Sequence, residues 1–427
     1  GVRVHLAGIG GVSMCPLAEV LAGKGLLVQG SDMMESDSVK HLRSKGISVA
    51  IGHNAENLGD CDFVIRTAAV HDDNPEIAAA RAAGIPVFER AEAWGAIMRR
   101  YEHALCVAGT HGKTTTTSMC THIFLAAQRD PTVMIGGTLP LFHSGYHVGH
   151  GDTIILESCE YCNSFLCFFP TVAVILNVEA DHLDFFKDLD DIKHSFRQFA
   201  ELVPPTGHVI ACADNAGAMD AVANLSRPVF TYGLDRDADC TAAILKDTEG
   251  TPSFDIVIHG ETYAHVRLHV YGRHNVLNAL AAASAAYVLG VPGEAVERGL
   301  DAFSGASRRF EHKGTYHGAE IYDDYAHHPD ELHALLTTAK ALGYQRLVVA
   351  FQPHTYTRTA KLFDRFVEEL KLADLAVVTS DNPRSEESRI LWVSPPPICV
   401  PGFPVPSIAP LWKRSQSSCV RSPSQGT

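Results

Sequence analysis

The sequence has few of the features that mark a membrane, nucleic-acid-binding or disulfide-stabilised protein. It contains no run of about 18 apolar residues, so we expect no membrane-spanning helix. Positive charge is scarce, because 35 Lys and Arg residues stand against 49 Asp and Glu residues and the net charge is −14. An acidic chain is a poor candidate for broad binding to nucleic acid or anionic membranes. A local phosphate-binding loop is still allowed, because it acts through backbone amides and one or two cations.

Cysteine is present, but it does not form a disulfide-type pattern. The 11 cysteines are odd in number and lie mostly inside apolar segments, which is typical of reduced, buried thiols in the cytoplasm. Cys159 and Cys162 form a lone CxxC with no second pair at zinc spacing, so we favour ordinary packing over a metal or redox role. The first residues read as a strand rather than a signal peptide.

Acidic residues are absent from the end of the chain. Residues 391–427 contain no Asp or Glu, carry a net charge of +3 and hold eight of the 22 prolines. No helical or strand periodicity survives there, so we expect a disordered or non-native tail. The preceding residues therefore carry a charge of −17, and they supply the folded part of the protein.

The rest of the chain alternates short apolar runs with helical patterns. Its 427 residues suggest about three domains, and 46% hydrophobic residues provide enough apolar material for their cores. The alternation predicts an α/β fold with parallel, helix-covered sheets. We expect three units, at 1–100, 101–313 and 314–390, followed by the tail.

The strongest motif is a Gly/Thr loop between the expected strand Ala104–Ala108 and the expected helix Thr116–Ala127. Successive amides and a helix N-terminus at such a place suit a bound phosphate. A Gly/Thr turn that only caps the helix is the alternative. Val107 stands where the usual P-loop has another glycine, so the loop is a shortened variant. The loop consists of Gly109, Thr110, His111, Gly112, Lys113, Thr114 and Thr115.

Two further strand ends carry candidate metal ligands. Lys113 would neutralise phosphate charge and the Thr114 hydroxyl would hold Mg²⁺. Glu157 follows the apolar run Thr153–Leu156, where a carboxylate can bind Mg²⁺ or, alternatively, cap a helix. His182 follows the next apolar run and could hold a second metal, although a histidine between acids is more often an exposed loop residue. We leave the role of Glu160 open.

Polar residues later in the chain form three more groups. Asn275 and Asn278 share a face of the expected helix Asn275–Leu289 and could read a base edge, or Asn275 could cap the helix. Arg308 could clamp a phosphate, or it could be a solvated linker charge. The third unit offers Asp324, Tyr325, His327, His328 and Arg358, all after strands.

The N-terminal loop gives a weaker signal for ligand binding than the 109–115 loop. Residues 8–13 resemble a dinucleotide-binding loop but lack the full GxGxxG pattern, and an NAD-dependent oxidoreductase built on them would leave the 109–115 loop unexplained. The candidate ligand contacts around this loop are Gly10, Gly11, Ser31, Asp32 and Thr67.

Together these motifs resemble the Mur ligase family over roughly residues 2–373. The 109–115 loop with the Asp-His pair at 181–182 would fit either Mur ligases or folylpolyglutamate synthases, but the third-unit motifs point to alanine-adding Mur ligases. The motifs are HLAGIGGVSM at 5–14, GTHGKTT at 109–115, NVEADHLD at 177–184, YGRHNVLNALAA at 271–282, SRRFE at 307–311, DDYAHHP at 323–329 and FQPHTYTRT at 351–359.

The resemblance implies a fold and a reaction. It implies a Rossmann-like first domain for the UDP end of the substrate, a central P-loop-type ATPase domain with a mostly parallel sheet, and an incomplete Rossmann-like third domain. The implied reaction joins L-alanine to the carboxylate of UDP-N-acetylmuramate through an acyl phosphate, in peptidoglycan precursor synthesis in the bacterial cytoplasm. ATP and Mg²⁺ are the implied cofactors.

The resemblance also implies roles for individual residues. Lys113, Glu157 and His182 would be catalytic, and Thr114 would join Glu157 and His182 as a metal ligand. The ATP site would comprise 109–115 with His274, Asn275, Asn278, Arg308 and Asp324. The UDP site would comprise Gly10, Gly11, Ser31, Asp32 and Thr67, and the third domain would add Tyr325, His327, His328 and Arg358.

Two segments depart from the family pattern. The stretch from Glu157 to Cys162 is less acidic than expected, which affects neighbouring substrate contacts. DNPR at 381–384 resembles the diaminopimelate-recognition motif of another Mur ligase step, and the tail matches neither. Another Mur ligase step, a hybrid, or an ATP-binding protein inactivated by its altered C-terminus are therefore the alternatives.

Overall fold

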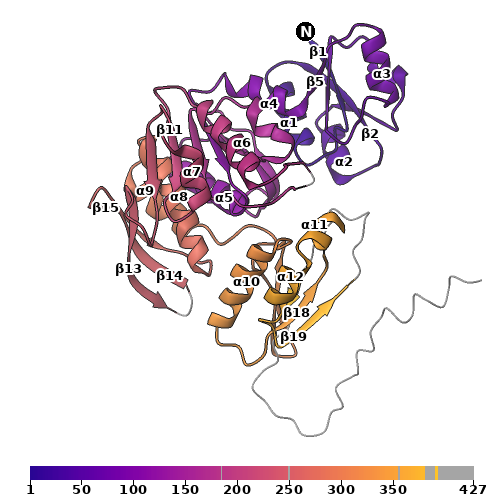
Figure 1. The fold of residues 1–427 in the computed structure, drawn as a ribbon. Coiled ribbons are helices and arrows are strands. Elements are labelled where there is room, and N and C mark those ends of the chain that lie inside the picture. Colours follow the sequence, from indigo (N-terminus) through magenta and orange to yellow (C-terminus); the bar gives the residue numbers. More distant parts are fainter. Residues whose placement is uncertain (184, 249–250, 354–355, 380–389, 393–427) are drawn as a thin grey trace, which may run out of the picture.

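The computed structural model describes residues 1–183, 185–248, 251–353, 356–379 and 390–392. Three α/β units follow one another along the chain, each built on its own sheet (Figure 1). The predicted α/β class is confirmed. The middle unit contacts both of the others, and in Figure 1 the first unit (indigo) lies to its upper right and the third (orange to yellow) below it.

The first unit is a five-stranded parallel sheet in the order β3-β2-β1-β4-β5. Glycines lie where β1 turns into the first helix, and Gly8 has a φ of 80°. The elements are β1 (Arg3–Ala7), α1 (Met14–Gly23), β2 (Leu27–Asp32), α2 (Asp37–Ser44), β3 (Ser48–Ile51), η1 (Ala55–Leu58), β4 (Phe63–Arg66), α3 (Pro75–Ala82), β5 (Val87–Glu89) and α4 (Arg90–Met98).

The middle unit is a ten-stranded sheet in the order β15-β14-β13-β12-β11-β10-β6-β9-β7-β8. Strands β12 to β7 are parallel, with β13 added in parallel at one side and antiparallel strands at both edges. The elements are β6 (His103–Ala108), α5 (Lys113–Ala126), β7 (Thr132–Leu139), β8 (Ser144–His147), β9 (Thr153–Glu157), η2 (Tyr161–Cys167), β10 (Val172–Ile175), α6 (Leu189–Glu201), β11 (His208–Cys212), α7 (Ala216–Val222), β12 (Val229–Tyr232), β13 (Cys240–Thr248), β14 (Thr251–Ile258), β15 (Glu261–Arg267), α8 (Arg273–Val288) and α9 (Gly293–Asp301).

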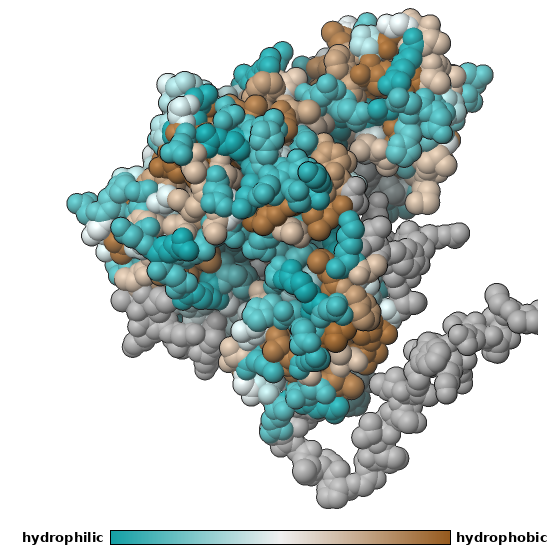
Figure 2. All heavy atoms as spheres, in the orientation of Figure 1, coloured by the Kyte–Doolittle hydropathy of each residue, from teal (hydrophilic) through white to brown (hydrophobic). Residues whose placement is uncertain are grey.

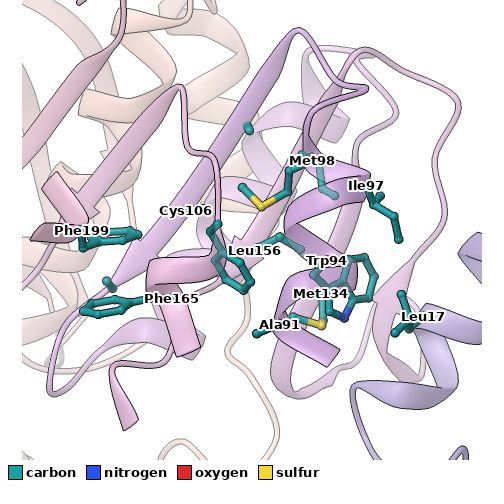
Figure 3. Packing of buried hydrophobic residues seen from close by; sticks show 14 of the residues in the cluster. Leu17, Ala91, Trp94, Ile97, Met98, Cys106, Met134, Leu156, Phe165 and Phe199 are labelled. Carbon is teal, nitrogen blue, oxygen red and sulfur yellow. The ribbon is translucent and has the colours of Figure 1, made fainter. Parts of the chain in front are cut away.

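The central strands of the middle sheet are apolar on both faces because helices cover both sides. One face contributes to a hydrophobic cluster shared with the first unit, in which Trp94 of α4 lies close to Met134 and Leu17 (Figure 3). Phe165 and Phe199 stack with ring centroids 4.6 Å apart in the same cluster. The other face packs against α5, α8 and α9. The first two units thus share one continuous core.

The third unit has a mixed sheet in the order β16-β17-β20-β18-β19. Only β18 and β19 are parallel, because β20 runs antiparallel between β17 and β18. The expected Rossmann-like pattern is therefore interrupted in the middle of this sheet. The elements are β16 (Glu311–Tyr316), β17 (Ala319–Asp324), α10 (Pro329–Ala341), β18 (Val348–Phe351), α11 (Tyr356–Lys361), α12 (Phe363–Leu370), β19 (Leu375–Val378) and β20 (Ile390–Trp392).

The third sheet has an apolar edge strand, β19, that the described residues leave exposed. All four residues of β19 are exposed, including Leu375, Val377 and Val378. Figure 2 shows hydrophobic residues gathered over this unit on the face in view. An exposed apolar edge strand is a place where another chain can pair.

The structure bears on the expectations about membrane-spanning helices, cysteines and the C-terminal tail. No helix among the described residues is long and apolar enough to cross a membrane. The nine described cysteines are unpaired and six are buried, while Cys159 and Cys162 are exposed. DNPR at 381–384 and tail residues 393–427 lie outside the described residues. The third sheet starts at Glu311, before the expected boundary at 314, and that domain division stays a prediction.

Candidate functional site

The loop between β6 and α5 is built for a close approach of backbone to a ligand. Gly112 has a φ of 83°, and a Cβ on it would lie 2.7 Å from Asn278 Oδ1. The helix begins at Lys113, earlier than the predicted Thr116. Its first internal hydrogen bond runs from Thr116 N to Gly112 O, so the amides of residues 113–115 precede that ladder and face the loop. Such amides, together with the helix dipole, favour a bound anion.

Lys113 is held over this loop by carboxylate and carbonyl oxygens. Its Nζ donates to Gly109 O at 2.5 Å and to Glu160 Oε2 at 3.1 Å. Burial acts to lower the pKa of Lys113, but the nearby charge of Glu160 outweighs it and leaves the pKa above its ordinary value. The side chain is therefore a fixed positive charge at the loop.

Thr114 and Glu157 meet as predicted. The Thr114 hydroxyl donates to Glu157 Oε1 at 3.1 Å, and Glu157 Oε2 accepts the Gly136 amide at 2.6 Å. A Cβ at Gly136 would lie 2.6 Å from Glu157 Oε1, so the glycine makes room for the carboxylate. Glu157 makes side-chain contacts to two other elements, which argues against a simple helix-capping role.

His182 lies beside Glu160. Its Nε2 is 3.9 Å from Glu160 Oε1 and 3.7 Å from Asp181 Oδ2, and its φ is 51°. Burial lowers the pKa of His182, which favours the neutral imidazole that binds metals. Of the three predicted metal residues, Thr114 and Glu157 thus meet, while His182 lies beside Glu160, whose role the sequence left open. Their metal-binding role stays a prediction.

The third unit reaches this region through α11. Arg358 Nε and Nη2 both lie 3.2 Å from Asp181 Oδ1, and Lys361 Nζ donates to Leu183 O at 2.7 Å. Burial acts to raise the pKa of Asp181, but His182 and Arg358 together hold it at about 2. Arg358 is therefore close to the predicted metal histidine rather than to the phosphate loop.

His111 of the loop also contacts the third unit. Its Nδ1 lies 3.3 Å from Glu331 Oε1, and its Nε2 lies 3.5 Å from Glu179 Oε2. Its ring centroid is 5.0 Å from that of His328. Burial acts to lower the pKa of His111, but the two carboxylates raise it to about 9, so the imidazolium bridges the two units at neutral pH.

The same surroundings bring together potential metal donors. Among the described residues, His111, His328 and Asp330 offer donor atoms within 4.8 Å of one another. Cys159 and Cys162 are both exposed, which differs from the expected packing in a core, and their role stays a prediction. Because His111 already pairs with two carboxylates, an ion pair is the simpler account of this cluster.

A cavity of about 280 Å³ opens beside the loop, between the middle and third units. Asn275 and Asn278 line it from α8, and Asn278 Nδ2 donates to Asn275 Oδ1 at 3.1 Å. Asn278 Oδ1 also accepts the Thr116 hydroxyl at 3.2 Å. The predicted shared face is thus present. Asn275 does not cap the helix, because Gly272 is the N-cap and Asn275 Nδ2 donates to Tyr271 O at 2.7 Å.

Some of the predicted ATP-site residues line this cavity, and others lie away from it. His111, Gly112, Thr115, His274 and Asp324 line it. Arg309 also lines it, whereas Arg308 stacks on Tyr325 with its Cζ 4.7 Å from the ring centroid.

Asp324 closes the cavity from the third unit. Its two oxygens accept the amides of Phe310 and Ala326, both at 2.7 Å. Burial raises the pKa of Asp324 to about 6, with Arg309 acting in the opposite direction.

The two histidines before α10 serve the fold of that segment. His328 is the N-cap of α10, is fully buried, and its Nδ1 accepts the Asp330 amide at 3.3 Å. His327 Nδ1 donates to Tyr325 O at 2.8 Å, and burial lowers the pKa of His327 to about 4. Both side chains thus help to shape the loop that carries Glu331 to His111, although His328 Nε2 is buried without a hydrogen-bond partner among the described residues.

A larger cleft of about 880 Å³ lies between the first and middle units. Gly11, Asp32 and Thr67 line it, and Glu157 forms part of its far wall. Gly10 N donates to Asp32 Oδ2 at 2.9 Å, so Gly10 positions that carboxylate. Ser31 instead donates to Glu76 Oε2 at 2.6 Å inside the first unit. The Ser31 side chain therefore forms part of the interior of the first unit and does not line the cleft.

Several residues of the site were not predicted. Asn177 accepts the His111 amide through Oδ1 at 2.7 Å and donates through Nδ2 to His111 O at 3.1 Å, which fixes the loop to the end of β10. Its signal was present, because it lies at the carboxyl end of a buried strand, as Glu157 does. Arg309 belongs to the SRRFE motif, but the sequence did not show that it rather than Arg308 lines the cavity, and Glu331 gave no signal, since both positions depend on how the third unit packs.

Family models match nearly the whole described chain. The description "Mur ligase family, catalytic domain" matches residues 3–102, "Mur ligase middle domain" matches 107–286, and "Mur ligase, glutamate ligase domain" matches 308–393. The three matches follow the three sheets in order.

Individual relatives are similar over the same length. The UDP-N-acetylmuramate–L-alanine ligase of Agathobacter rectalis is 47% identical over 379 residues, covering 88% of this chain and 83% of the relative. The ligase of the same name from Caldanaerobacter subterraneus is 44% identical, covering 88% and 82%. The crystal structure of UDP-N-acetylmuramate-alanine ligase from Thermotoga maritima superposes with a TM-score of 0.75 at 32% identity, covering 90% and 86%.

Proposed function

Because this chain belongs to the Mur ligase family, we propose that it joins L-alanine to the carboxylate of UDP-N-acetylmuramate at the expense of ATP. One observation carries the proposal in structural terms. The phosphate loop separates two cavities, and the Thr114–Glu157 hydrogen bond of 3.1 Å spans the wall between them. A phosphate at this loop would therefore face a second substrate in the larger cleft.

We assign the smaller cavity to ATP. The amides of residues 113–115 would hold the phosphates, and Lys113 would balance their charge. Asn275 and Asn278 would face the base from α8, while Arg309 and Asp324 would approach from the third unit. Arg308 would not contact ATP directly but would help to position Tyr325, on which it stacks.

The residues at the loop also suit Mg²⁺. Thr114 and Glu157 converge with hydroxyl and carboxylate oxygens, the hard donors that Mg²⁺ prefers. His182 would serve a second ion near the substrate carboxylate. Bound Mg²⁺ would supply positive charge to neutralise phosphate oxygens. Mn²⁺ binding followed by electron paramagnetic resonance tests this independently of turnover, and Glu157→Gln should weaken it at least tenfold.

The first chemical step needs alignment more than a base. The substrate carboxylate oxygen attacks the γ-phosphorus of ATP, forms an acyl phosphate and releases ADP. Both reactants are anions, so Lys113 and the loop amides lower the barrier by offsetting their repulsion. Contacts between the middle and third units, from His111 to Glu331 and from Asp181 to Arg358, would close the site against water.

In the second step the free amine of L-alanine attacks the acyl carbon. Inorganic phosphate leaves and the amine loses a proton, which gives the amide. Neutral His182 and the carboxylate of Asp181, which lie 3.7 Å apart, would be near the acyl phosphate. Arg358 holds Asp181 in place from the third unit.

Phosphate release tests the proposal. The full chain is assayed with ATP, Mg²⁺ and UDP-N-acetylmuramate while L-alanine, glycine, L-serine, diaminopimelate or a tripeptide is offered. We expect release that depends on every substrate and is fastest with L-alanine. The tripeptide is included because a murein peptide ligase from Psychrobacter arcticus superposes with a TM-score of 0.71 at 26% identity. Measurable ATP binding without any alanine-dependent release would contradict the proposal.

We place this reaction in the bacterial cytoplasm. ATP and UDP-linked precursors are cytoplasmic metabolites, and the described cysteines are unpaired, as is usual in that compartment. Fractionation of the native bacterium, with activity followed by phosphate release, tests the location.

A further inference from the structure

A third cavity, of about 670 Å³, lies against the sheet of the first unit, away from both cavities described above. We name it the α4 groove. Its floor consists of Phe63 and Ile65 of β4 and Phe88 of β5, and α1 and α4 form its sides. Phe88 remains 42% exposed although its ring centroid lies 5.9 Å from that of Phe63. Part of an aromatic sheet face is therefore left exposed by the elements that the structure describes.

The rim of the α4 groove is cationic. Lys24, Arg99 and Arg100 lie along it, and Arg99 stacks on Phe169 with its Cζ 3.7 Å from the ring centroid. Within the described part of the chain, no carboxylate lies within 4.0 Å of the charged groups of these three residues. Such a cluster of positive charge is a local exception in a protein with a net charge of −14.

The acidic residue in the described lining is already occupied. Glu92 Oε2 accepts the Glu89 amide at 2.7 Å and closes the capping box of α4. Glu92 keeps its negative charge, but the described lining sets three cations, Lys24, Arg99 and Arg100, against this one carboxylate and is positive on balance. An apolar floor with a cationic rim complements a ligand that has an apolar body and one negative group.

Helix α4 separates the α4 groove from the larger cleft. Arg90, Ala91 and Trp94 face the cleft, while Ala93 and Ile97 face the groove. Trp94 Nε1 donates to Ser13 O at 3.3 Å, and Arg90 donates to Ser13 Oγ. A displacement of α4 would therefore move the loop that borders the cleft, because packed interiors transmit such shifts.

We propose that the α4 groove is a second ligand site, which takes a small amphipathic anion and changes the affinity of the cleft through α4. The ligand class is a ring-bearing apolar body with one carboxylate, sulfonate or phosphate. The volume of about 670 Å³ is in the range of small-molecule sites, which favours such a ligand over a flat protein surface. The proposed change in cleft affinity rests on the proposed function, because the proposed function assigns the cleft to a UDP-linked substrate. Binding of an anion in the α4 groove does not depend on that assignment.

The fluorescent anion 8-anilinonaphthalene-1-sulfonate tests binding. It is titrated into the full chain with saturating ADP and UDP, which compete for the other two cavities. We expect saturable binding that Phe88→Asp weakens at least tenfold. Leu141→Asp, at a site 51% exposed and outside the groove, makes the same charge change and should shift affinity less than twofold. Equal affinity in wild type and Phe88→Asp would overturn the proposal, as would equal losses in both variants.

The rim provides a second variant that does not depend on the folding of Phe88→Asp. Arg100→Glu changes an exposed side chain and should weaken the probe at least threefold; unchanged affinity would count against an anion site. In a Trp392→Phe, Trp412→Phe background, Trp94 is the remaining tryptophan. Its emission should fall as the probe binds beside α4, and Phe88→Asp should abolish that loss.

Calorimetry tests the coupling without relying on turnover. UDP affinity is measured with and without saturating probe, in wild type and in Phe88→Asp. We expect at least a threefold change in wild type and none in the variant. An unchanged UDP affinity in wild type overturns the coupling. A failure of UDP to bind at all contradicts the proposed function and removes the coupling with it, while the probe comparison still decides the groove.

Discussion

His111 and Glu331 tie the phosphate loop to the third unit, with His111 Nδ1 3.3 Å from Glu331 Oε1. On its other side His111 lies 3.5 Å from Glu179 of the middle unit. One imidazolium therefore joins carboxylates from two units, at the residue next to Gly112, the N-cap of α5. Docking of the third unit and the shape of the phosphate loop are linked at this point.

This link should weaken in alkali. The pKa of His111 lies at about 9, above the ordinary 6.5, because Glu179 and Glu331 outweigh the effect of burial. The contribution of the charged pair is thus complete below about pH 6.5 and is lost as the pH rises through about 9. We expect small-angle scattering with a bound ATP analogue to show the third unit separating over that range.

Glu331→Gln removes one of the two charges that face His111 and should lower stability by roughly 1–3 kcal/mol and flatten the pH response. Glu320→Gln is the matched control, because Glu320 pairs with His312 on the surface of the same unit. A pH response that persists in Glu331→Gln, or that disappears equally in the control, would show that another group is responsible.

Lys113→Ala should abolish turnover while substrate binding in the larger cleft survives. Its ammonium lies over the phosphate loop and contacts Glu160, and Lys113 is not part of the lining of that cleft. We expect kcat to fall by at least about 1,000-fold, as when a preorganised charge is removed from a transition state. UDP affinity measured by calorimetry should change less than twofold. Parallel loss of both quantities would contradict the separation of the two cavities.

Gly112→Ala should damage nucleotide binding beyond the cost of its backbone conformation. Gly112 and Gly46 both have a φ of 83°, but an added Cβ has no neighbour within 4 Å at Gly46 and lies 2.7 Å from Asn278 Oδ1 at Gly112. Each alanine should cost roughly 1–2 kcal/mol through the left-handed conformation. Only Gly112→Ala should also lower ATP affinity, at least tenfold, because Asn278 is held by two hydrogen bonds. Equal ATP affinity in the two variants would remove the steric part of this argument.

A lysine on β19 should reduce self-association. Val378 is 55% exposed on the outermost described strand of the third sheet, where another chain can pair with the free edge. Val378→Lys is expected to lower concentration-dependent light scattering, whereas Leu141→Lys, an exposed loop position, should not. Scattering that falls as much in the loop variant would indicate a general charge effect.

The sequence predicted the parts of the site that depend on local order. Loop 109–115 and Glu157 follow parallel strands, whose carboxyl ends meet at one edge of a sheet, so their meeting could be foreseen. The contacts between units could not be predicted, because no local sequence pattern encodes how the third unit docks on the middle unit. Arg309 rather than Arg308 therefore lines the cavity, and Glu331 was not recognised.

Two other differences have local causes. The α5 helix starts at Lys113 because Gly112 supplies the left-handed turn that lets it begin directly after the loop. Ser31 sits at the end of β2, where a ligand contact was expected, but its hydroxyl is taken by buried Glu76. Neither the turn nor the buried carboxylate is visible in the spacing of the motifs.

The division of the cores has a consequence for how the protein unfolds. One cluster joins the first and middle units without a break, whereas the third unit relies on a small core of its own that includes Leu336, Val349 and Phe351. We expect calorimetry to record two transitions, with the third unit melting first. A nucleotide held between the middle and third units should raise the lower melting temperature and draw the two transitions together.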